Sequence, residues 1–345
     1  MKARLNQRAA VILVMILMWS VSASARDITD MAGRRVRVPD EIHRVYGVTP
    51  PVSYMVYAMD PALLVGSNFP FSRYELEYLD PRMKDLPVVG GWFGQGRVAN
   101  LENLLAVKPD IILLWRWNES AVNEKIERIL KPLNIPAVYV VMKTLHDYPA
   151  AFRFIGELLN MKDRAGALAA YGERVLGETA RVCASVQHDK KVTVYYAEGA
   201  DGLSTECDAS VHAALIPLSG GENVHHCPDT NSFGMIKISI EQILDYNPDV
   251  IISHDDMFLN HYKSDAKWQN IKAVKNGRVY RIPRKPFNWF DRPPSFMQLL
   301  GVQWLTRLLH PDLYSIDTAS ETTGFYRLFL NVELSETKAR ELMQQ

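Results

Sequence analysis

The stretch LENLLAVKPDIILLW, residues 101–115, decides the fold because a similar stretch, IEQILDYNPDVIISH, occupies residues 240–254. The two copies align without gaps, and both carry a glutamate at the second position and Pro-Asp in the middle. Each copy has the pattern of a short amphipathic helix, a turn and a buried strand. A helix–turn–strand unit repeated at domain-sized spacing predicts two similar α/β lobes in one chain.

The segment between the two copies is helical in pattern from about residue 147 to residue 185, with apolar residues at helical spacing. An unbroken helix of that length would span roughly 50 Å, which is enough to bridge two lobes. We therefore predict an α/β fold with two similar lobes joined by one long rigid helix, and a ligand cleft between the lobes at the strand ends. The expected boundaries are residues 1–25 for a signal peptide, 26–145 for the N-terminal lobe, 146–188 for the connecting helix and 189–345 for the C-terminal lobe.

The first 25 residues have the pattern of a secretory signal peptide. Lys2, Arg4 and Arg8 precede an apolar run at residues 9–21, and Ala-Ser-Ala follows at residues 23–25. The apolar run is short for a membrane-spanning helix, although an uncleaved anchor is the alternative. No cysteine follows the cleavage site, so we expect a periplasmic protein that is not lipid-anchored.

The charge balance argues against nucleic acid as a partner. The chain has 39 basic and 39 acidic residues, and removal of the signal peptide leaves 36 basic residues, a formal charge near −3. This balance gives no basic footprint for nucleic acid or for an anionic membrane surface. We expect a monomer.

Three cysteines follow the signal peptide, at positions 183, 207 and 227. In an oxidising compartment Cys207 and Cys227 could form a disulfide around a loop of about twenty residues. Free thiols are one alternative. A metal site is another, since His225 and His226 adjoin Cys227.

Aromatic and basic residues gather where strands are predicted to end. One group surrounds Arg116 after the first repeat, one lies in a glycine-rich turn at residues 90–96, and one lies in the loop at residues 286–294. Aromatic faces and guanidinium groups suit a large, flat, partly anionic ligand, whereas core packing is the alternative for each tryptophan. The candidate ligand-binding residues are Trp92, Trp115, Arg116, Trp117, Asn288, Trp289 and Arg292.

A metal-dependent enzyme is a weaker alternative. His254 and Asp256, with His225, could form a metal or acid–base cluster. However, the chain lacks the nucleophile-elbow, zincin and P-loop motifs, and a histidine before two aspartates at a strand end is typical of a helix N-cap. We expect no enzymatic activity and no cofactor.

Several motifs together resemble one known family. They are ITDMAGR at residues 28–34, NLENLLAVKPD at 100–110, SGGEN at 219–223, IEQILDYNPD at 240–249 and NGRVY at 276–280. The chain resembles the class III periplasmic substrate-binding proteins of ABC importers, which bind iron–siderophore complexes, haem and cobalamin. The resemblance implies a small hinge closure. It also implies that one glutamate on each lobe, here Glu102 and Glu241, docks on the permease subunits.

The resemblance leaves the ligand open. Cobalamin binders have an Asp-Trp-Phe-Glu-Arg run where this chain has Asn288-Trp-Phe-Asp-Arg292, so the first acidic residue is missing. The paired arginines of catecholate-siderophore binders would be Arg116 and Arg292, with Arg73 and Arg284 in reserve. We expect a metal chelate, in the first place an iron–siderophore complex. Cobalamin, haem, a nickel or cobalt chelate, and an oxyanion such as molybdate are the alternatives.

Overall fold

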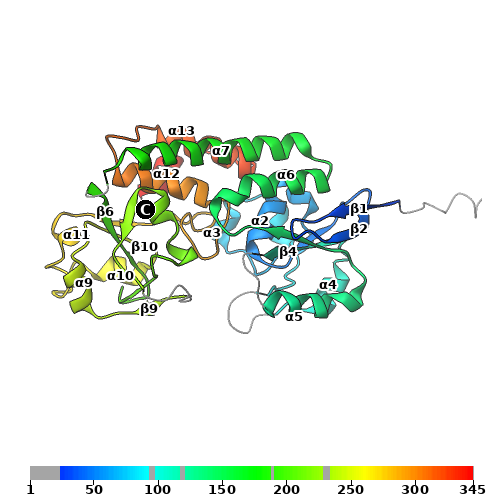
Figure 1. Cartoon of the computed structure of the whole chain (residues 1–345), viewed down its shortest axis with the longest axis horizontal. Helices are drawn as coiled ribbons and strands as arrows, with labels where there is room; N and C mark the ends of the chain where they lie inside the picture. The colour runs from blue at the N-terminus through cyan, green and yellow to red at the C-terminus, as the bar shows by residue number, and fades with distance from the viewer. Residues whose placement is uncertain (1–23, 93–97, 117–120, 188–189, 228–233, 345) are drawn as a thin grey trace, which may run out of the picture.

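Two α/β lobes lie side by side beneath a layer of helices (Figure 1). The computed structural model describes residues 24–92, 98–116, 121–187, 190–227 and 234–344. Trp117 and most of the predicted signal peptide lie outside these residues. None of the helices within them is both long and apolar enough to cross a membrane. The two α/β lobes confirm the predicted fold class.

The N-terminal lobe is built on a parallel sheet of three strands in the order β3-β4-β5. Two isolated parallel bridges accompany the sheet, one between Val45 and Leu64 and one between Ser67 and Val88. An antiparallel hairpin precedes the sheet. The elements are β1 (Ala25–Thr29), β2 (Arg35–Pro39), β3 (Val45–Gly47), α2 (Pro50–Met59), η1 (Pro61–Leu63), α3 (Arg73–Leu76), η2 (Pro81–Asp85), α4 (Leu101–Ala106), β4 (Ile111–Arg116), α5 (Ala121–Leu130), η3 (Lys131–Leu133), β5 (Ala137–Val141) and η4 (Leu145–Asp147).

The C-terminal lobe has a second parallel sheet, in the order β11-β10-β6-β8, and a small antiparallel pair, β7 with β9. Because all four strands of the main sheet are parallel, their carboxyl ends lie at one edge. The elements are β6 (Val192–Ala197), β7 (Ser204–Thr205), η6 (Val211–Ala213), α8 (Leu215–Leu218), β8 (Gly221–Asn223), β9 (Ile236–Lys237), α9 (Ile240–Tyr246), β10 (Val250–Ser253), α10 (Asp256–His261), α11 (Lys272–Lys275), β11 (Val279–Arg281) and α12 (Gln298–Leu309).

The two copies of the repeat form the same structure, α4 with β4 and α9 with β10. Each helix begins with a side-chain cap: Asn100 accepts from the Asn103 amide at 3.0 Å, and Ser239 accepts from the Gln242 amide at 3.2 Å. Such caps satisfy backbone donors that a helix leaves unpaired at its start. The prediction of two equivalent helix–turn–strand units is confirmed.

The Pro-Asp turn of the repeat also has the same role in both lobes. The residue before each proline, Lys108 or Asn247, is left-handed, with φ of 40° and 41°. The following aspartate then accepts from the backbone of the neighbouring strand. Asp110 accepts from the Arg44 amide at 2.9 Å, and Asp249 accepts from the Thr193 amide at 3.0 Å. The repeat therefore fixes the central strand of each sheet to its neighbour.

The connecting segment differs from the unbroken helix predicted over residues 147–185. It consists of α6 (Tyr148–Leu158) and α7 (Lys162–Ser185), separated at Asn160, which has φ of 56°. The two helices pack together, and α7 alone passes over both lobes (Figure 1). Its 24 residues correspond to about 36 Å.

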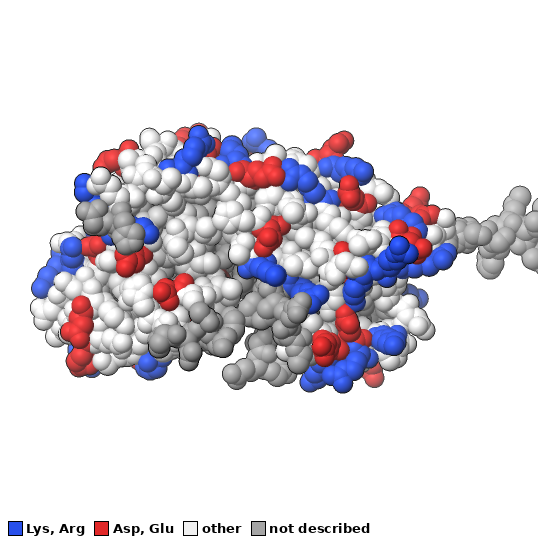
Figure 2. Space-filling view, viewed as in Figure 1, with Lys and Arg blue, Asp and Glu red and all other residues white. Residues whose placement is uncertain are grey.

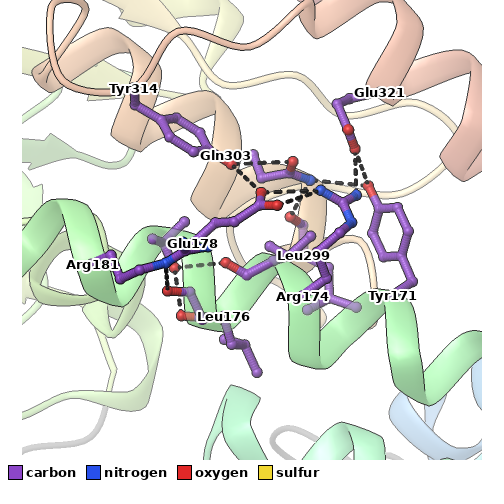
Figure 3. A network of polar contacts seen from close by, with 12 residues as sticks. Tyr171, Arg174, Leu176, Glu178, Arg181, Leu299, Gln303, Tyr314 and Glu321 are labelled. Atoms are coloured by element: carbon purple, nitrogen blue, oxygen red, sulfur yellow. Dashed lines mark hydrogen bonds and ion pairs between the residues drawn. The ribbon is translucent and has the colours of Figure 1, made fainter.

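A polar network fixes α7 against the helices beside it (Figure 3). Arg174 of α7 forms an ion pair with Glu321 at 2.7 Å, and Tyr171 accepts from Gln303 of α12 at 3.0 Å. Tyr314 donates to the same Gln303 at 3.3 Å. The connection between the lobes is thus braced along its length.

The C-terminal segment returns to the N-terminal lobe. It consists of α13 (Thr318–Phe325), a π-helical turn (Tyr326–Leu330) and α14 (Glu336–Gln344). Tyr57 of α2 donates to the Leu330 carbonyl at 2.9 Å, and the ring of Phe152 meets that of Phe329. One buried apolar cluster includes residues of both lobes. Residues 318–344 therefore do not pack with the second lobe alone, whereas the expected C-terminal lobe, residues 189–345, included them.

Candidate ligand-binding site

The carboxyl edge of the second sheet carries an arginine surrounded by acids. Glu198 follows β6 directly, and Asp291 and Arg292 lie in the loop after β11. Arg292 donates through Nε to Glu198 at 2.7 Å and through Nη2 to Glu206, with Asp291 3.4 Å away. The three acidic side chains are 0% exposed, whereas that of Arg292 is 29% exposed. We call Glu198, Glu206, Asp291 and Arg292 the arginine–carboxylate cluster.

The cluster has more negative than positive charge. Burial raises the pKa of Glu198 to about 7, against the opposing effect of its bond to Arg292. His212 donates to Asp291 at 2.7 Å. Burial disfavours the charged imidazole, but the bond to Asp291 and its charge outweigh that effect and raise the pKa of His212. Three buried acids thus share one arginine and one histidine whose pKa is raised.

Two oxygens of the cluster have no hydrogen-bond partner among the described residues, Glu198 Oε2 and Asp291 Oδ2. Glu206 is better satisfied, because Ser210 donates to its second oxygen at 2.7 Å. Unpaired buried acceptors are costly, so they favour a donor or a cation supplied from outside the protein.

His254 lies beside the cluster, at the end of β10. Tyr196 contacts its Nδ1 at 3.0 Å, and burial lowers the pKa of His254 and keeps the imidazole neutral. The enzyme alternative joined His254 with His225 and Asp256. Among the described residues, the side chains of these three do not lie together as one metal-binding group. Asp256 instead forms ion pairs with arginines, and the preceding Asp255 caps α10, accepting from Met257 at 2.9 Å.

The N-terminal lobe places Trp115 and Arg116 at the end of β4, as predicted. Trp115 is half-buried and donates through its indole nitrogen to the Met142 carbonyl at 3.0 Å. The Arg116 guanidinium lies 5.8 Å from the ring centre of Tyr139. Trp92 is 7% exposed, in the core of this lobe, and its indole nitrogen has no partner among the described atoms.

The prediction that Trp289 contacts the ligand is wrong for this structure. Its side chain is 1% exposed and lies in the core, and its indole nitrogen donates to the Lys285 carbonyl at 3.0 Å. The loop can pack this closely because residue 301 of α12 is glycine. A Cβ atom there would lie 1.9 Å from the Trp289 carbonyl oxygen. Trp289 is therefore an anchor for the loop.

Neighbours of Trp289 also have structural roles. Asn288 is half-buried and accepts from the Phe290 amide at 2.8 Å, which folds the loop back on itself. Phe287 reaches the other lobe, where its ring stacks on that of Tyr54 with centres 3.8 Å apart. A cavity of about 10 Å³ beside this contact has room for no more than about one water molecule. A metal chelate would not fit in it.

Sequence reasoning identified Arg292 but missed its acidic partners and His212. Glu198 offered a signal, because it directly follows the apolar strand VTVYYA. An acid at the end of a parallel strand lies where ligands usually bind. Glu206 and Asp291 gave no comparable signal, because only the folded chain brings these separate segments together.

The two predicted docking residues are exposed on equivalent helices. Glu102 lies in the first turn of α4 and Glu241 in the first turn of α9. Figure 1 shows both helices at the same lower edge of the molecule, one beneath each lobe. Hydrogen bonds from its own amide and from Ser239 lower the pKa of Glu241, so its carboxylate is charged at neutral pH.

The charges and the cysteines can be located in the structure. Figure 2 shows lysines and arginines interspersed with acids over the visible face. Cys207 and Cys227 form a disulfide with Cα atoms 5.5 Å apart. Within the described chain Cys183 is the free cysteine, and its thiol contacts the Leu218 carbonyl at 3.2 Å.

Two lobes, parallel strand ends and a braced connecting helix are the features of a solute-binding protein, and sequence comparison agrees. The family model described as "Periplasmic binding protein" matches residues 71–286, more than half of the chain. The chain belongs to this family. It is a periplasmic binding protein of the ABC-transporter class and not an enzyme.

Three relatives are informative about the class. The chain is similar to a solved structure called an ABC transporter solute binding protein from Sulfurospirillum deleyianum, with 38% identity, a TM-score of 0.86 and coverage of 93% of this chain and 99% of that one. It is 26% identical to the molybdate-binding protein MolA of Haemophilus influenzae, over 92% of this chain and 95% of that protein. It is 28% identical to a vitamin B12-binding protein of Pectobacterium atrosepticum, over 77% and 88%. The names of the second and third relatives give different ligands, molybdate and vitamin B12.

Proposed function

We propose that the protein captures a metal chelate in the periplasm, in the first place a ferric siderophore, and delivers it to an ABC permease. The observation that carries the proposal is the arginine–carboxylate cluster at the strand ends of the second lobe. The first lobe offers Trp115 and Arg116 at the end of β4. A chelate is large enough to contact both lobes and can present different groups to each.

The charge of the cluster favours a particular kind of chelate. In their ionised form the buried acids repel a bare dianion, since like charges brought together without water are unfavourable. The partly exposed Arg292 can still donate to a ligand oxygen, because its Nη1 has no bond to the described residues. We therefore expect a ligand that accepts from Arg292 and also presents hydrogen-bond donors or positive charge to Glu198 and Asp291.

Tryptophan fluorescence of the purified mature protein tests this proposal. The ligands are ferric catecholate and hydroxamate siderophores, haemin, cobalamin, nickel–histidine and molybdate, each titrated under the same buffer conditions. Saturable quenching by one class of chelate is the expected result. Failure of every chelate to quench, or quenching by molybdate alone, contradicts the proposal.

Molybdate is the second candidate because a molybdate-binding protein matches nearly the full length of this chain. The variant Glu198→Gln separates the two candidates. Removal of this negative charge should weaken binding of a chelate that presents donors, and should strengthen binding of an oxyanion. Glu333→Gln, which alters an exposed glutamate paired with Arg327, is the matched control and should change neither affinity.

Delivery to the permease is the part of the proposal that rests on Glu102 and Glu241. Their equivalence by repeat, their exposure and their position on one edge of the molecule support it. A permease with two similar subunits would present one complementary contact to each lobe.

A further inference from the structure

A second group of possible ligand atoms includes Cys207, the residue after Glu206. Cys207 follows β7, and His225 and Cys227 follow β8. The two sulfurs and one imidazole nitrogen of these residues lie within 4.8 Å of one another. In the structure the sulfurs are joined as a disulfide. We call these three residues the sulfur–imidazole cluster.

His225 supplies an independent sign that the cluster can hold an ion. Its side chain is 7% exposed, and its Nε2 atom has no hydrogen-bond partner among the described residues. The other ring nitrogen, Nδ1, contacts the Tyr246 hydroxyl at 2.9 Å, and that hydroxyl accepts from Gln242 at 2.8 Å. Because the Tyr246 oxygen can also accept from an Nδ1 hydrogen, Nε2 can carry a free lone pair.

The surroundings of His225 match those of metal-binding histidines. Such residues are neutral and usually donate their second ring nitrogen to an acceptor, which fixes the ring. Tyr246 can be that acceptor. Burial lowers the pKa of His225, so the ring is neutral at neutral pH.

We propose that the reduced protein binds a thiophilic cation, Zn²⁺ or Cu⁺, through Cys207, Cys227 and His225. A dithiol reductant supplies two electrons and two protons, so that the disulfide becomes two thiols while the reductant forms its own disulfide. The cation then binds the two sulfurs and Nε2, and two thiol protons are released. None of these three side chains belongs to the arginine–carboxylate cluster, so the proposal does not rest on the proposed chelate function.

Zinc–sulfur bonds of about 2.3 Å in a tetrahedral site place two sulfurs about 3.8 Å apart. The sulfurs must therefore separate after reduction, which rotation of the two cysteine side chains can achieve because their Cα atoms are 5.5 Å apart. A fourth position would be open to water, because the nearby carboxylate of Asp208 is engaged by His226 at 2.8 Å. The cation would also replace the disulfide as the cross-link between the two loops.

Zinc binding by the full mature protein tests the proposal. The protein is reduced with a phosphine, and Zn²⁺ alone is titrated in competition with a chromophoric chelator. We expect one equivalent to bind to the reduced protein and none to the oxidised protein. Substitution of Co²⁺ should give the intense visible and near-ultraviolet bands of tetrahedral thiolate coordination. A reduced protein that takes up no zinc overturns the proposal.

Variants identify the ligands without relying on loss of a cysteine. His225→Gln leaves the disulfide able to form and should lower zinc affinity of the reduced protein at least tenfold. Cys183→Ser and His226→Ala are controls that should bind zinc as the wild type does. Circular dichroism confirms that each variant is folded. Equal zinc affinity in His225→Gln and Cys183→Ser, or loss of binding in His226→Ala, contradicts the assigned ligands.

Discussion

At the scale of single residues, the positively charged Arg292 contacts three buried acids. Arg292→Ala would leave Glu198, Glu206 and Asp291 without their main partner. We expect the ligand-free protein to lose about 3 kcal/mol of unfolding free energy, the low end for a broken buried pair because the guanidinium is partly exposed. Urea unfolding measures the loss. Arg327→Ala, which alters an exposed pair, is the control and should leave the midpoint unchanged.

Unchanged stability of Arg292→Ala would show that the acids are solvated or protonated when the arginine is absent. In that event a loss of ligand affinity in this variant could be assigned to the ligand contact alone. With the expected loss of stability, affinity must be compared at a temperature at which both proteins are folded.

Glu198 should make the stability depend on pH. Burial raises its pKa from 4.5 in the unfolded chain to about 7, so the folded state holds the proton more tightly. Its contribution to stability is full below pH 4.5 and is lost as the pH rises through 7. Glu198→Gln lacks this loss. The unfolding free energy of the wild type relative to this variant should therefore fall between pH 5 and pH 8 by an amount on the order of 2 kcal/mol. A difference that stays constant over this range would exclude the raised pKa.

The candidate site could be predicted from sequence only in part. A basic and aromatic loop signals a function, and this signal led to the prediction that the loop of Arg292 binds the ligand. The same signal did not separate Arg292 from Trp289, because burial depends on Gly301, which lies on another element. The acids at positions 198 and 206 approach Arg292 only through the order of the strands, which composition does not reveal.

At the scale of elements, the loop after β11 depends on the close approach of α12. Gly301→Ala would place a methyl group against the backbone of Trp289 and displace the loop that carries Asp291 and Arg292. We expect a lower melting temperature and weaker ligand binding, measured by calorimetry and fluorescence titration. Gly177→Ala in α7 is the control, since a Cβ there meets nothing within 4 Å and alanine favours helix. Wild-type affinity in Gly301→Ala would show that the loop tolerates the shift.

Elements defined by local signals were predicted correctly, and those defined by their neighbours were not. The repeat helices combine an N-cap, an apolar face and a Pro-Asp turn within one short segment, so their sequence determines them. The break between α6 and α7 has no proline or glycine at its centre. Asn160 adopts the left-handed conformation instead, which asparagine tolerates better than most residues.

At the scale of the whole molecule, the docking proposal makes a prediction about transport. Glu102→Lys combined with Glu241→Lys should abolish uptake, because charge reversal at both proposed contacts would turn attraction to the permease into repulsion. Folding and ligand affinity should be unaffected, since both residues are exposed and lie on the helices that precede β4 and β10. Uptake by cells and binding by the purified variant are compared. Normal uptake by the double variant would remove the docking role.

The shared core has a consequence for how the membrane partner can recognise a loaded protein. Tyr54 and Phe287 stack across the two lobes, α7 is braced over both, and one apolar cluster includes residues of each. A body joined in this way changes its outline little when a ligand arrives, so empty and loaded molecules compete for the same permease surface. The permease must then detect a loaded protein by direct contact with the ligand or with the loops around Arg292. The ratio of loaded to empty protein in the periplasm would set the rate of import.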